Sequence, residues 1–500
     1  MKLGPIRGGV HPDYRKELAS EKAVVPLPIP RMLYVPLLQH VGAPAEPIVA
    51  IGDIVLKGQM IARSQGPVSA PVHAPTSGRV VDIGAYTAPH PSGLPQRTIV
   101  IEADGRDAWA DLPAPIADPF AVARSVISER VAQAGIVGLG GASFPSAVKL
   151  DLGTRHPIDT LLINGAECEP YLTCDDRVMR EYADEVVDGV RIMQYALGAK
   201  RSIIAIEGNK PQALATMRAA VATFSDLSVV AVPVRYPMGS ADHLALAVTG
   251  REKPAGRRMA EIGVLVHNVA TARAVSLAVR QGKPLISRVV TFTGGALAEP
   301  KNIDVPLGTH VADVVAFCGG FREHPVRIIN GGPMMGQPLA NLESPVVKGT
   351  CGIVALSEAE VKIRDPQPCI RCGSCVTACP NGLVPLEMMS LIKHDDLDKA
   401  AAVGVEDCIS CGSCSYICPS FIPLVHYFEY AKGRIWAIAR DKRKQDRVKK
   451  LVEARAARLE KIALAKREAM AARKAAAAAA PAPAAAPAAP TEALQPEASS

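Results

Sequence analysis

Two copies of one cysteine pattern constrain this chain more than any other feature of its sequence. Each copy reads CxxCxxCxxxCP, and the second begins 28 residues after the proline that ends the first. Three cysteines at two-residue gaps can hold one corner of an iron-sulfur cube, while the fourth, next to a chain-reversing proline, reaches the other cube. The spacing therefore predicts two 4Fe-4S clusters with crossed ligands. The first cluster takes Cys369, Cys372, Cys375 and Cys418, and the second takes Cys408, Cys411, Cys414 and Cys379.

The alternative uses of these cysteines are a pair of zinc sites or disulfides. Zinc is satisfied by four ligands in two CxxC pairs, and it does not need a repeated triplet followed by Cys-Pro. Eight of the 12 cysteines belong to the pattern, and a chain that keeps so many thiolates for iron is expected in a reducing compartment. The other four lack ligand spacing and are expected to be small buried hydrophobic residues: Cys168, Cys174, Cys318 and Cys351.

The net charge of +7 is concentrated in one segment. Residues 432–474 hold 16 Lys and Arg against five Asp and Glu, which leaves the rest of the chain at about minus 4. Only Trp436 is aromatic in that segment, so the stacking platforms of single-strand binders are missing and nucleic acid is not an expected partner. Residues 1–12 lack the apolar core of a signal peptide, and no run of 18 strongly apolar residues predicts a membrane span.

The first 120 residues are dense in Pro, Gly and Val and predict an all-β unit. Within it, the stretches 52–59 and 74–78 resemble the two halves of a lipoyl-like or biotinyl-like barrel-sandwich fold. The hairpin tip that carries a modified lysine in those carriers reads Ser69 to Val72 here. We therefore expect the fold without a swinging arm.

Helical and strand patterns then alternate from residue 121 onward. A helix at Ala121–Ala134 precedes strands at 158–163, 203–206 and 229–234, which are separated by helices at Arg177–Leu197 and Pro211–Phe224. Such alternation predicts a mostly parallel sheet covered by helices. A small β-rich module, an α+β unit with a thin core around the cysteines and a long basic helix should follow. The predicted domains are 1–120 (barrel-sandwich), 121–285 (α/β), 286–350 (β module), 351–430 (two clusters), 431–474 (helix) and 475–500 (disordered Ala/Pro tail).

A glycine-rich turn, Gly138 to Lys149, lies at the start of the α/β domain. It fits neither the Walker pattern nor the dinucleotide fingerprint. Glycines nonetheless let backbone N–H groups approach a phosphate or a flat ring, and a helix N-terminus favours the anion. A second polar stretch, Asn164 to Pro170, follows the strand 158–163 directly, where open α/β sheets bind ligands.

Together these stretches resemble the FMN- and NADH-binding flavoprotein subunit of respiratory complex I. That family has the turn GxGGAGFPxxxK, a strand ending in NADESEP and a segment TTINNVET, whose counterparts here are 138–149, 164–170 and 264–271. The resemblance implies that Phe144 and Glu169 flank a nicotinamide. It also implies FMN-binding roles for Gly138, Gly140, Gly141, Lys149, Asn164, Glu167 and Asn268.

The chain departs from that family in two places. Ala166 replaces an Asp, and the acidic GEET segment reads Gly239, Ser240, Ala241, Asp242 here. These changes remove acidic residues that the family places near NADH, and they affect the NADH prediction more than the FMN prediction.

The order of all parts resembles the C subunits of the Rnf (Rsx) electron transport complexes over residues 1–430. The β module is then a β-grasp-like unit of the SLBB type, and the cysteine-rich part is a two-cluster ferredoxin domain. The resemblance implies a peripheral subunit on the cytoplasmic face of a bacterial inner membrane, within an ion-translocating NADH:ferredoxin oxidoreductase. Its expected partners are other subunits of that complex, a ferredoxin-type carrier or subunit, and the membrane surface.

Flavin is central to this expected function because hydride carries two electrons, a cluster carries one, and a flavin can handle both. Two alternatives remain open from the sequence. One is a cobalamin reductase of a bacterial microcompartment, which shares the domain order. The other is a non-catalytic iron-sulfur wiring subunit that binds no nicotinamide.

Overall fold

A parallel four-stranded sheet organises the fold of the computed structural model, which describes residues 3–479. Its strand order is β11-β10-β9-β12. The strands are β9 (Thr160–Gly165), β10 (Arg201–Glu207), β11 (Leu227–Val232) and β12 (Val264–Asn268). They read as nearly continuous apolar runs because helices cover both faces of the sheet.

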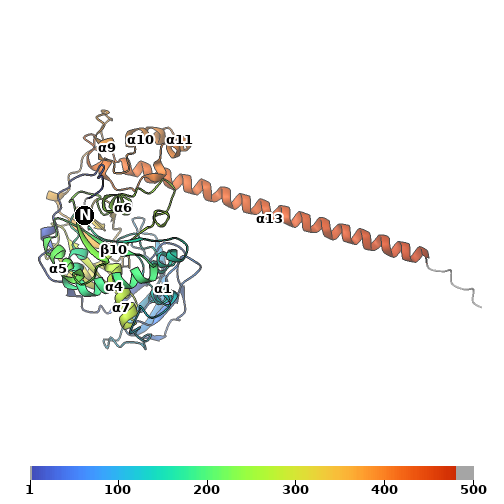
Figure 1. The fold of residues 1–500 in the computed structure, drawn as a ribbon, viewed down its shortest axis with the longest axis horizontal. Helices are drawn as coiled ribbons and strands as arrows, with labels where there is room; N and C mark the ends of the chain where they lie inside the picture. Colours follow the sequence, from blue (N-terminus) through green and yellow to red (C-terminus); the bar gives the residue numbers. More distant parts are fainter. Residues whose placement is uncertain (1–2, 480–500) are drawn as a thin grey trace, which may run out of the picture. The chain divides into compact units, whose positions relative to one another are not determined.

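The helices around this sheet form two layers. Leu161 and Ile204 pack in a core shared with α1, α4, α5 and α7, whereas Leu162 and Ile203 pack against α6. Figure 1 shows α6 on one side of β10 and α4 and α7 on the other. The helices are α1 (Arg124–Gln133), α2 (Ser146–Leu150), α3 (Cys174–Glu181), α4 (Ala183–Leu197), α5 (Pro211–Val221), α6 (Ala241–Thr249) and α7 (Val269–Gln281).

The expectation of one helix over Arg177–Leu197 is wrong. The structure has two helices, α3 and α4, that meet at Tyr182, where φ is −128° and ψ is 33°. The guanidinium of Arg273 lies 3.7 Å from the centre of the Tyr182 ring and holds it against α7. The break lets α3 turn its first residues toward the end of β9, which a straight helix could not do.

The N-terminal unit is a pair of antiparallel sheets around one apolar core. One sheet has the order β2-β8-β7-β4 and the other β3-β5-β6. The strands are β2 (Met32–Pro36), β3 (Glu46–Pro47), β4 (Ile54–Val55), β5 (Met60–Arg63), β6 (Val72–His73), β7 (Gly78–Thr87) and β8 (Pro95–Ala103).

The hairpin tip of this unit is bonded to the rest of the protein. Lys348 is fully buried, and its ammonium donates to the carbonyl oxygens of Pro71 at 2.8 Å and Gly135 at 2.7 Å. Burial lowers the pKa of Lys348 to about 7. On the other side, a ring nitrogen of His40 accepts the Ala70 N–H at 3.0 Å. These bonds hold the tip in place. The hairpin of a swinging-arm carrier has to be free to move, so this hairpin does not act as one.

A six-stranded mixed sheet forms the β module, in the order β1-β14-β13-β17-β15-β16. It takes in strand β1 from the N-terminal segment and β17, both of which lie outside residues 286–350. The elements are β1 (Val25–Pro26), β13 (Ser287–Thr293), β14 (Lys301–Pro306), α8 (Val311–Phe317), β15 (Arg327–Asn330), β16 (Gln337–Pro338) and β17 (Gly352–Leu356).

The cysteine-rich part consists of short helices joined by loops. The predicted unit, residues 351–430, begins with strand β17, and the structure assigns no further strand within residues 357–479. The core is thin, with Met388, Ile392 and Phe428 at its centre. The helices are α9 (Ser374–Ala378), α10 (Pro385–Lys393), α11 (Leu397–Ala402) and α12 (Ser413–Tyr416).

The last element is one long helix, α13 (Leu424–Ala479). Its first residues belong to the body, since Phe428 and Ala431 are buried there. From Lys432 on the chain is a separate unit, and its side chains are largely exposed. The helix includes residues 475–479 of the tail that we expected to be disordered, and the rest of that tail lies outside the described residues. Among residues 3–479, no helix has the length and apolarity needed to cross a membrane.

The contact between α4 and α7 gives a test of this packing. A Cβ at Gly189 of α4 would overlap the Ala272 carbonyl oxygen of α7. We expect Gly189→Ala to force the two helices apart and to lower stability by about 1–3 kcal/mol, as overpacking does. Thermal unfolding followed by circular dichroism measures this.

Gly433→Ala is the matched control. Gly433 lies in α13 with no atom within 4 Å of an added Cβ, so the change should leave the body unaffected and favour the helix by up to about 1 kcal/mol. Equal melting of Gly189→Ala and the wild type would contradict the α4–α7 packing.

Candidate functional site

The eight motif cysteines line two separate cavities. One cavity is lined by Cys369, Cys372, Cys375 and Cys418, together with apolar residues such as Met389. The other is lined by Cys379, Cys408, Cys411 and Cys414. Each cavity therefore combines three cysteines of one motif with the last cysteine of the other. This geometry supports the crossed ligand assignment, which stays a prediction.

The two motifs have the same local backbone. Arg371 and Ser410, each two residues after the first cysteine, have φ of 55° and 54°. Gly373 and Gly412 follow in the same left-handed region at 79° and 77°. These turns aim backbone N–H groups at sulfur, as in the donation from Arg371 to the Cys369 Sγ at 3.4 Å. A cage of thiols with N–H donors suits an anionic iron-sulfur cluster, so the residues present fit the predicted group.

The glycine turn is a tight hairpin held by two other parts of the chain, α7 and β13. The Gly138 N–H donates to the Phe144 carbonyl at 2.8 Å, and Gly141 adopts a φ of 99°. The Leu139 N–H donates to the Thr271 hydroxyl of α7 at 2.9 Å, and Arg288 of β13 donates to the Leu139 carbonyl at 3.1 Å. The turn is therefore fixed before any ligand arrives.

The predicted segments meet at the carboxyl edge of the parallel sheet. Asn164 and Asn268 are register partners at the ends of β9 and β12. A Cβ added to Gly140 would lie 3.3 Å from the Asn268 Cβ, so the glycine turn lies directly against this edge. An added Cβ at Gly141 would meet nothing within 4 Å. Glycine on a surface at this edge leaves room for a flat ring or a phosphate, as FMN requires.

The two asparagines shape the edge through their amides. Asn268 accepts from the Ala270 N–H at 2.9 Å and so caps α7, and its amide nitrogen donates to Asp175 at 2.6 Å. Asn164 donates to the Gly239 carbonyl at 2.8 Å. These bonds place two helix starts and the Gly239 loop around the same edge.

Lys149 and Glu167, two further predicted FMN-binding residues, also have their side chains hydrogen-bonded within the protein. The Lys149 ammonium donates to the Val266 carbonyl at 3.2 Å, and burial lowers its pKa. The Glu167 carboxylate accepts the N–H groups of Asp175 at 2.7 Å and Asp176 at 3.2 Å in the first turn of α3. Burial, reinforced by the charge of Glu167, raises the pKa of Asp175 to about 7.

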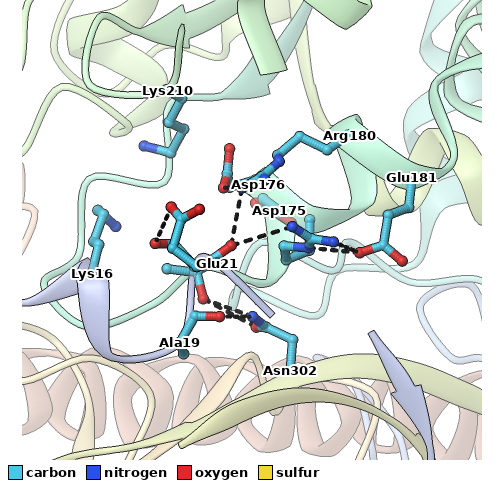
Figure 2. A network of polar contacts seen from close by, with 12 residues as sticks. Lys16, Ala19, Glu21, Asp175, Asp176, Arg180, Glu181, Lys210 and Asn302 are labelled. Atoms are coloured by element: carbon cyan, nitrogen blue, oxygen red, sulfur yellow. Dashed lines mark hydrogen bonds and ion pairs between the residues drawn. The ribbon is translucent and has the colours of Figure 1, made fainter. Parts of the chain in front are cut away.

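Two lysines that sequence reasoning missed hold the loop 165–172. The ammonium of Lys16 donates to three carbonyl oxygens of this loop, those of Glu167, Glu169 and Leu172, at 2.9, 3.0 and 2.5 Å. Lys210, which starts α5, donates to the Ala166 carbonyl at 2.6 Å. Figure 2 shows the two lysine side chains on one side of the view and Arg180 and Glu181 on the other. Lys16 belongs to no sequence motif, and it lies about 150 residues before its partners in the chain. The sequence therefore gave no indication that it contacts this loop.

The two residues predicted to flank a nicotinamide lie in different surroundings. The Glu169 carboxylate accepts the N–H groups of Met334 at 3.1 Å and Met335 at 2.8 Å, and burial raises its pKa to about 7. Phe144 is half-buried in the glycine turn. No hydrogen bond joins the two residues within the described part of the chain. Their role at a nicotinamide stays a prediction.

The four cysteines outside the motifs are reduced, and three of them are buried. Burial raises the pKa of Cys168 to about 12, so it is a neutral thiol. Its sulfur accepts the Gly239 N–H at 3.3 Å. Cys168, Cys174 and Cys318 are therefore small buried residues, as expected, whereas Cys351 is half-buried.

The geometry defines a class of protein: a flavin- and iron-sulfur-containing electron-transfer protein. Four family models match in the order expected. They are the RnfC barrel sandwich hybrid domain at 5–106, the Nuo51 FMN-binding domain at 131–277, the SLBB domain at 289–338 and the 4Fe-4S dicluster domain at 361–419. The multidomain fold and the two kinds of cofactor, FMN and 4Fe-4S, are confirmed.

Curated relatives define the family. The chain is 54% identical over 434 residues to the C subunit of the ion-translocating oxidoreductase complex of Rhodobacter capsulatus, covering 86% of this chain and 83% of the relative. It is 45% identical to the C subunit of the proton-translocating ferredoxin:NAD(+) oxidoreductase complex of Clostridium ljungdahlii, covering 80% and 86%. The chain therefore belongs to the family of C subunits of ion-translocating oxidoreductase complexes, which agrees with the first of our expectations rather than with a cobalamin reductase.

A solved structure, the NAD+-reducing [NiFe]-hydrogenase in the H2-reduced state, matches more distantly. The identity is 20% and the TM-score 0.44, over 60% of this chain and 61% of that chain. The relationship at this level identifies neither a site nor a function.

Cys418→Ala tests the crossed ligands. It should remove the cluster of Cys369, Cys372 and Cys375 and leave the other cluster intact, because Cys418 lines the first cavity only. EPR after dithionite reduction, with iron quantitation, measures this. Cys318→Ala, a buried cysteine outside both cavities, should keep both signals. Loss confined to the cluster of Cys408 would reject the assignment.

Gly140→Val tests the FMN site predicted where the glycine turn meets the carboxyl edge of the parallel sheet, which we call the flavin edge. The branched side chain would press on Asn268 and fill the space at the turn, so the purified variant should contain no FMN and an unchanged amount of iron. Gly208→Ala is the control, since its added Cβ would come no nearer than 3.8 Å to the Val232 carbonyl. Stoichiometric FMN in Gly140→Val would place the flavin elsewhere.

Glu169 should make stability depend on pH. Its pKa rises from 4.5 when unfolded to about 7 when folded. The folded state therefore holds the proton more tightly, and the stabilisation is full below pH 4.5 and lost as pH rises through 7. We compare the melting temperatures of the wild type and of Glu169→Gln. We expect the difference, wild type minus variant, to decrease as the pH rises from about 5 to about 8. Thermal melts in matched buffers measure it.

Glu46→Gln provides the contrast for that series. The hydrogen bond from Arg63 lowers the pKa of Glu46, so its contribution is lost as pH falls. A pH-independent difference for Glu169→Gln would show that Glu169 does not titrate in this range.

Proposed function

We propose that this chain passes electrons between NAD(H), FMN and two 4Fe-4S clusters as the C subunit of an ion-translocating NADH:ferredoxin-type oxidoreductase complex. The observation that carries the proposal is the meeting of the glycine turn, Asn164 and Asn268 at one sheet edge, in the same compact unit as two four-cysteine cavities. The name of the Clostridium relative, which belongs to a ferredoxin:NAD(+) oxidoreductase complex, supports the choice of donor and acceptor.

Each part of the site has a distinct task in this proposal. Bound flavin supplies the exchange between two-electron and one-electron chemistry. Gly138, Gly140 and Gly141 leave room for it, and Asn164 and Asn268 fix the surrounding backbone. Glu169 and Phe144 orient the nicotinamide. The proposal also keeps the predicted order of domains, 1–120, 121–285, 286–350, 351–430, 431–474 and 475–500, with β1 and β17 added to the sheet of the β module and residues 475–479 to the helix.

Anaerobic purification followed by cofactor quantitation tests this function. The chain should contain about eight iron and eight sulfide, for two 4Fe-4S clusters, with one FMN. Titration with NADH should then bleach the flavin and the clusters. Bound flavin that NADH does not reduce would overturn the nicotinamide part of the proposal.

A wiring subunit that holds clusters without binding nicotinamide is the second candidate. The observation that favours it is that Met334 and Met335 already occupy both carboxylate oxygens of Glu169. The two candidates differ in one readout, because dithionite would reduce both clusters of a wiring subunit while NADH would reduce neither.

Residues 432–479 supply the proposed attachment to a membrane complex on the cytoplasmic side of a bacterial inner membrane. Residues 432–474 carry a net charge of +11, and the largely exposed helix offers no buried apolar face of its own. A basic residue that reaches an anionic leaflet gains up to about 1 kcal/mol. A third of these charges would therefore suffice for reversible binding to lipid headgroups or to an acidic subunit. Other subunits of the complex and a ferredoxin-type carrier are the proposed protein partners.

Truncation after Gly433 tests the helix. The cut keeps Phe428 and Ala431, which pack in the body, so both clusters and the flavin should remain. Binding to anionic vesicles at low salt should fall at least tenfold in co-sedimentation.

Salt supplies the control for that truncation. Screening shortens the attraction from about 10 Å at 0.1 M to about 3 Å at 1 M, so 1 M salt should release the full chain as well. Undiminished binding of the truncated protein would show that the helix is only a solvated extension.

A further inference from the structure

One of the two cysteine cavities is joined to the flavin edge by a buried tyrosine. The Tyr236 side chain is fully buried, and its hydroxyl donates to the Cys411 carbonyl at 2.7 Å. Its backbone pairs with Val10 in both directions, at 2.8 and 3.0 Å. Tyr236, Val10, Cys168 and Cys411 belong to one apolar cluster. The tyrosine is thus fixed at both its ring and its main chain.

The same tyrosine is three residues from the flavin edge. The chain runs from Tyr236 to Gly239, whose carbonyl accepts from Asn164 at 2.8 Å. The Gly239 N–H donates to the Cys168 sulfur at 3.3 Å. The segment 236–239 therefore contacts Cys411, which lines the second cavity, at one end and Asn164, a predicted FMN residue, at the other.

Two further contacts enclose this cavity from the body of the protein. An added Cβ at Gly8 would overlap the Cys379 carbonyl, so the N-terminal segment lies directly on the last cysteine of the first motif. An added Cβ at Gly412 would lie 2.9 Å from the Met334 carbonyl. The N–H of that same Met334 donates to Glu169.

The other cavity faces outward. In the first cavity Cys369 and Cys372 are exposed and Cys375 is buried, whereas in the second cavity Cys411 and Cys414 are buried and the other two cysteines are half-buried. Ile370, which lines the first cavity, is 69% exposed. The two predicted clusters thus stand in different surroundings, one against the flavin-binding part and one at the surface.

We propose that the cluster of Cys379, Cys408, Cys411 and Cys414 exchanges electrons directly with the flavin, and that Tyr236 is the positioning residue of this junction. The outer cluster of Cys369, Cys372, Cys375 and Cys418 then exchanges electrons with an external one-electron carrier. Each transfer moves one electron, which oxidises one centre and reduces the other by one. Because electron transfer slows steeply with distance, the proposed order follows the contacts: Tyr236 bonds to Cys411, which lines the second cavity, and its segment reaches Asn164. The order rests on the proposed function, while the role of Tyr236 at the cluster does not.

The Tyr236 phenol also has an electrostatic effect on the predicted cluster of Cys379, Cys408, Cys411 and Cys414, which we call the inner cluster. The Tyr236 hydroxyl donates its proton to the carbonyl oxygen of Cys411 at 2.7 Å. An O–H dipole that points its positive end at the Cys411 loop stabilises an added electron on the cluster, and hydrogen bonding around a cluster is one of the levers on its potential.

Tyr236→Phe tests the junction without NADH. The variant keeps the ring and loses the donor, so the midpoint potential of the inner cluster should fall while that of the outer cluster and the FMN content stay unchanged. EPR-monitored titration with dithionite measures both potentials. Tyr195→Phe is the matched control, because its hydroxyl also donates to a backbone carbonyl, that of Val122, at 2.7 Å. No shift, or equal shifts in both clusters, would overturn the role of Tyr236.

Rapid mixing with NADH tests the order of the centres. In Cys418→Ala, which should retain the inner cluster, that cluster should be reduced as fast as in the wild type. In Cys379→Ala, which should retain the outer cluster, reduction should be at least tenfold slower although the flavin bleaches normally. The reverse result would overturn the order. If NADH does not bleach the wild-type flavin, the proposed function fails, and the dithionite titration still decides the role of Tyr236.

Discussion

The hydrogen bonds from Lys16 to the loop 165–172 are the interaction on which the arrangement of the predicted flavin and nicotinamide residues depends. One ammonium binds three carbonyl oxygens of a loop that contains two non-glycine residues of positive φ, Glu167 at 48° and Tyr171 at 69°. Such a backbone is strained and persists only where its surroundings determine it. Lys210 holds the start of the loop in the same way. Through this loop the N-terminal segment, the parallel sheet and the β module are joined at one place.

The charges in this region are arranged to offset the cost of burial. A buried ammonium is expensive unless hydrogen bonds and opposite charges satisfy it. Burial lowers the pKa of Lys16, and the neighbouring Lys210 lowers it further, while Glu167 and Glu207 oppose the shift. Lys210 and the fully buried Glu207 form an ion pair at 3.4 Å. The region next to the flavin edge therefore holds several charged side chains that are fixed by hydrogen bonds and ion pairs.

The sequence allowed the fold and much of the site to be predicted, and the limits of prediction have physical causes. Asn164 and Asn268 could be found because each ends an apolar run, and parallel strands bring their carboxyl ends together. The four-cysteine sets could be found from spacing alone. Lys16 and Tyr236 could not, because both act through contacts distant in sequence and neither stands in a periodic pattern. Tyr182 ends a helix through its contact with Arg273, which local propensity does not register.

The N-terminal segment has a consequence for the order in which the molecule is assembled. Its backbone bonds reach Ala247 from Gly4 and Ala378 from Gly9, and Val25 in β1 pairs with Ile303 in β14. Chains fold as they leave the ribosome, N-terminal parts first, yet this segment has no native partner until hundreds of later residues have emerged. The first residues to be synthesised are thus among the last to dock. The contact of this segment with the loop that ends in Cys379 can form only after that loop has been synthesised.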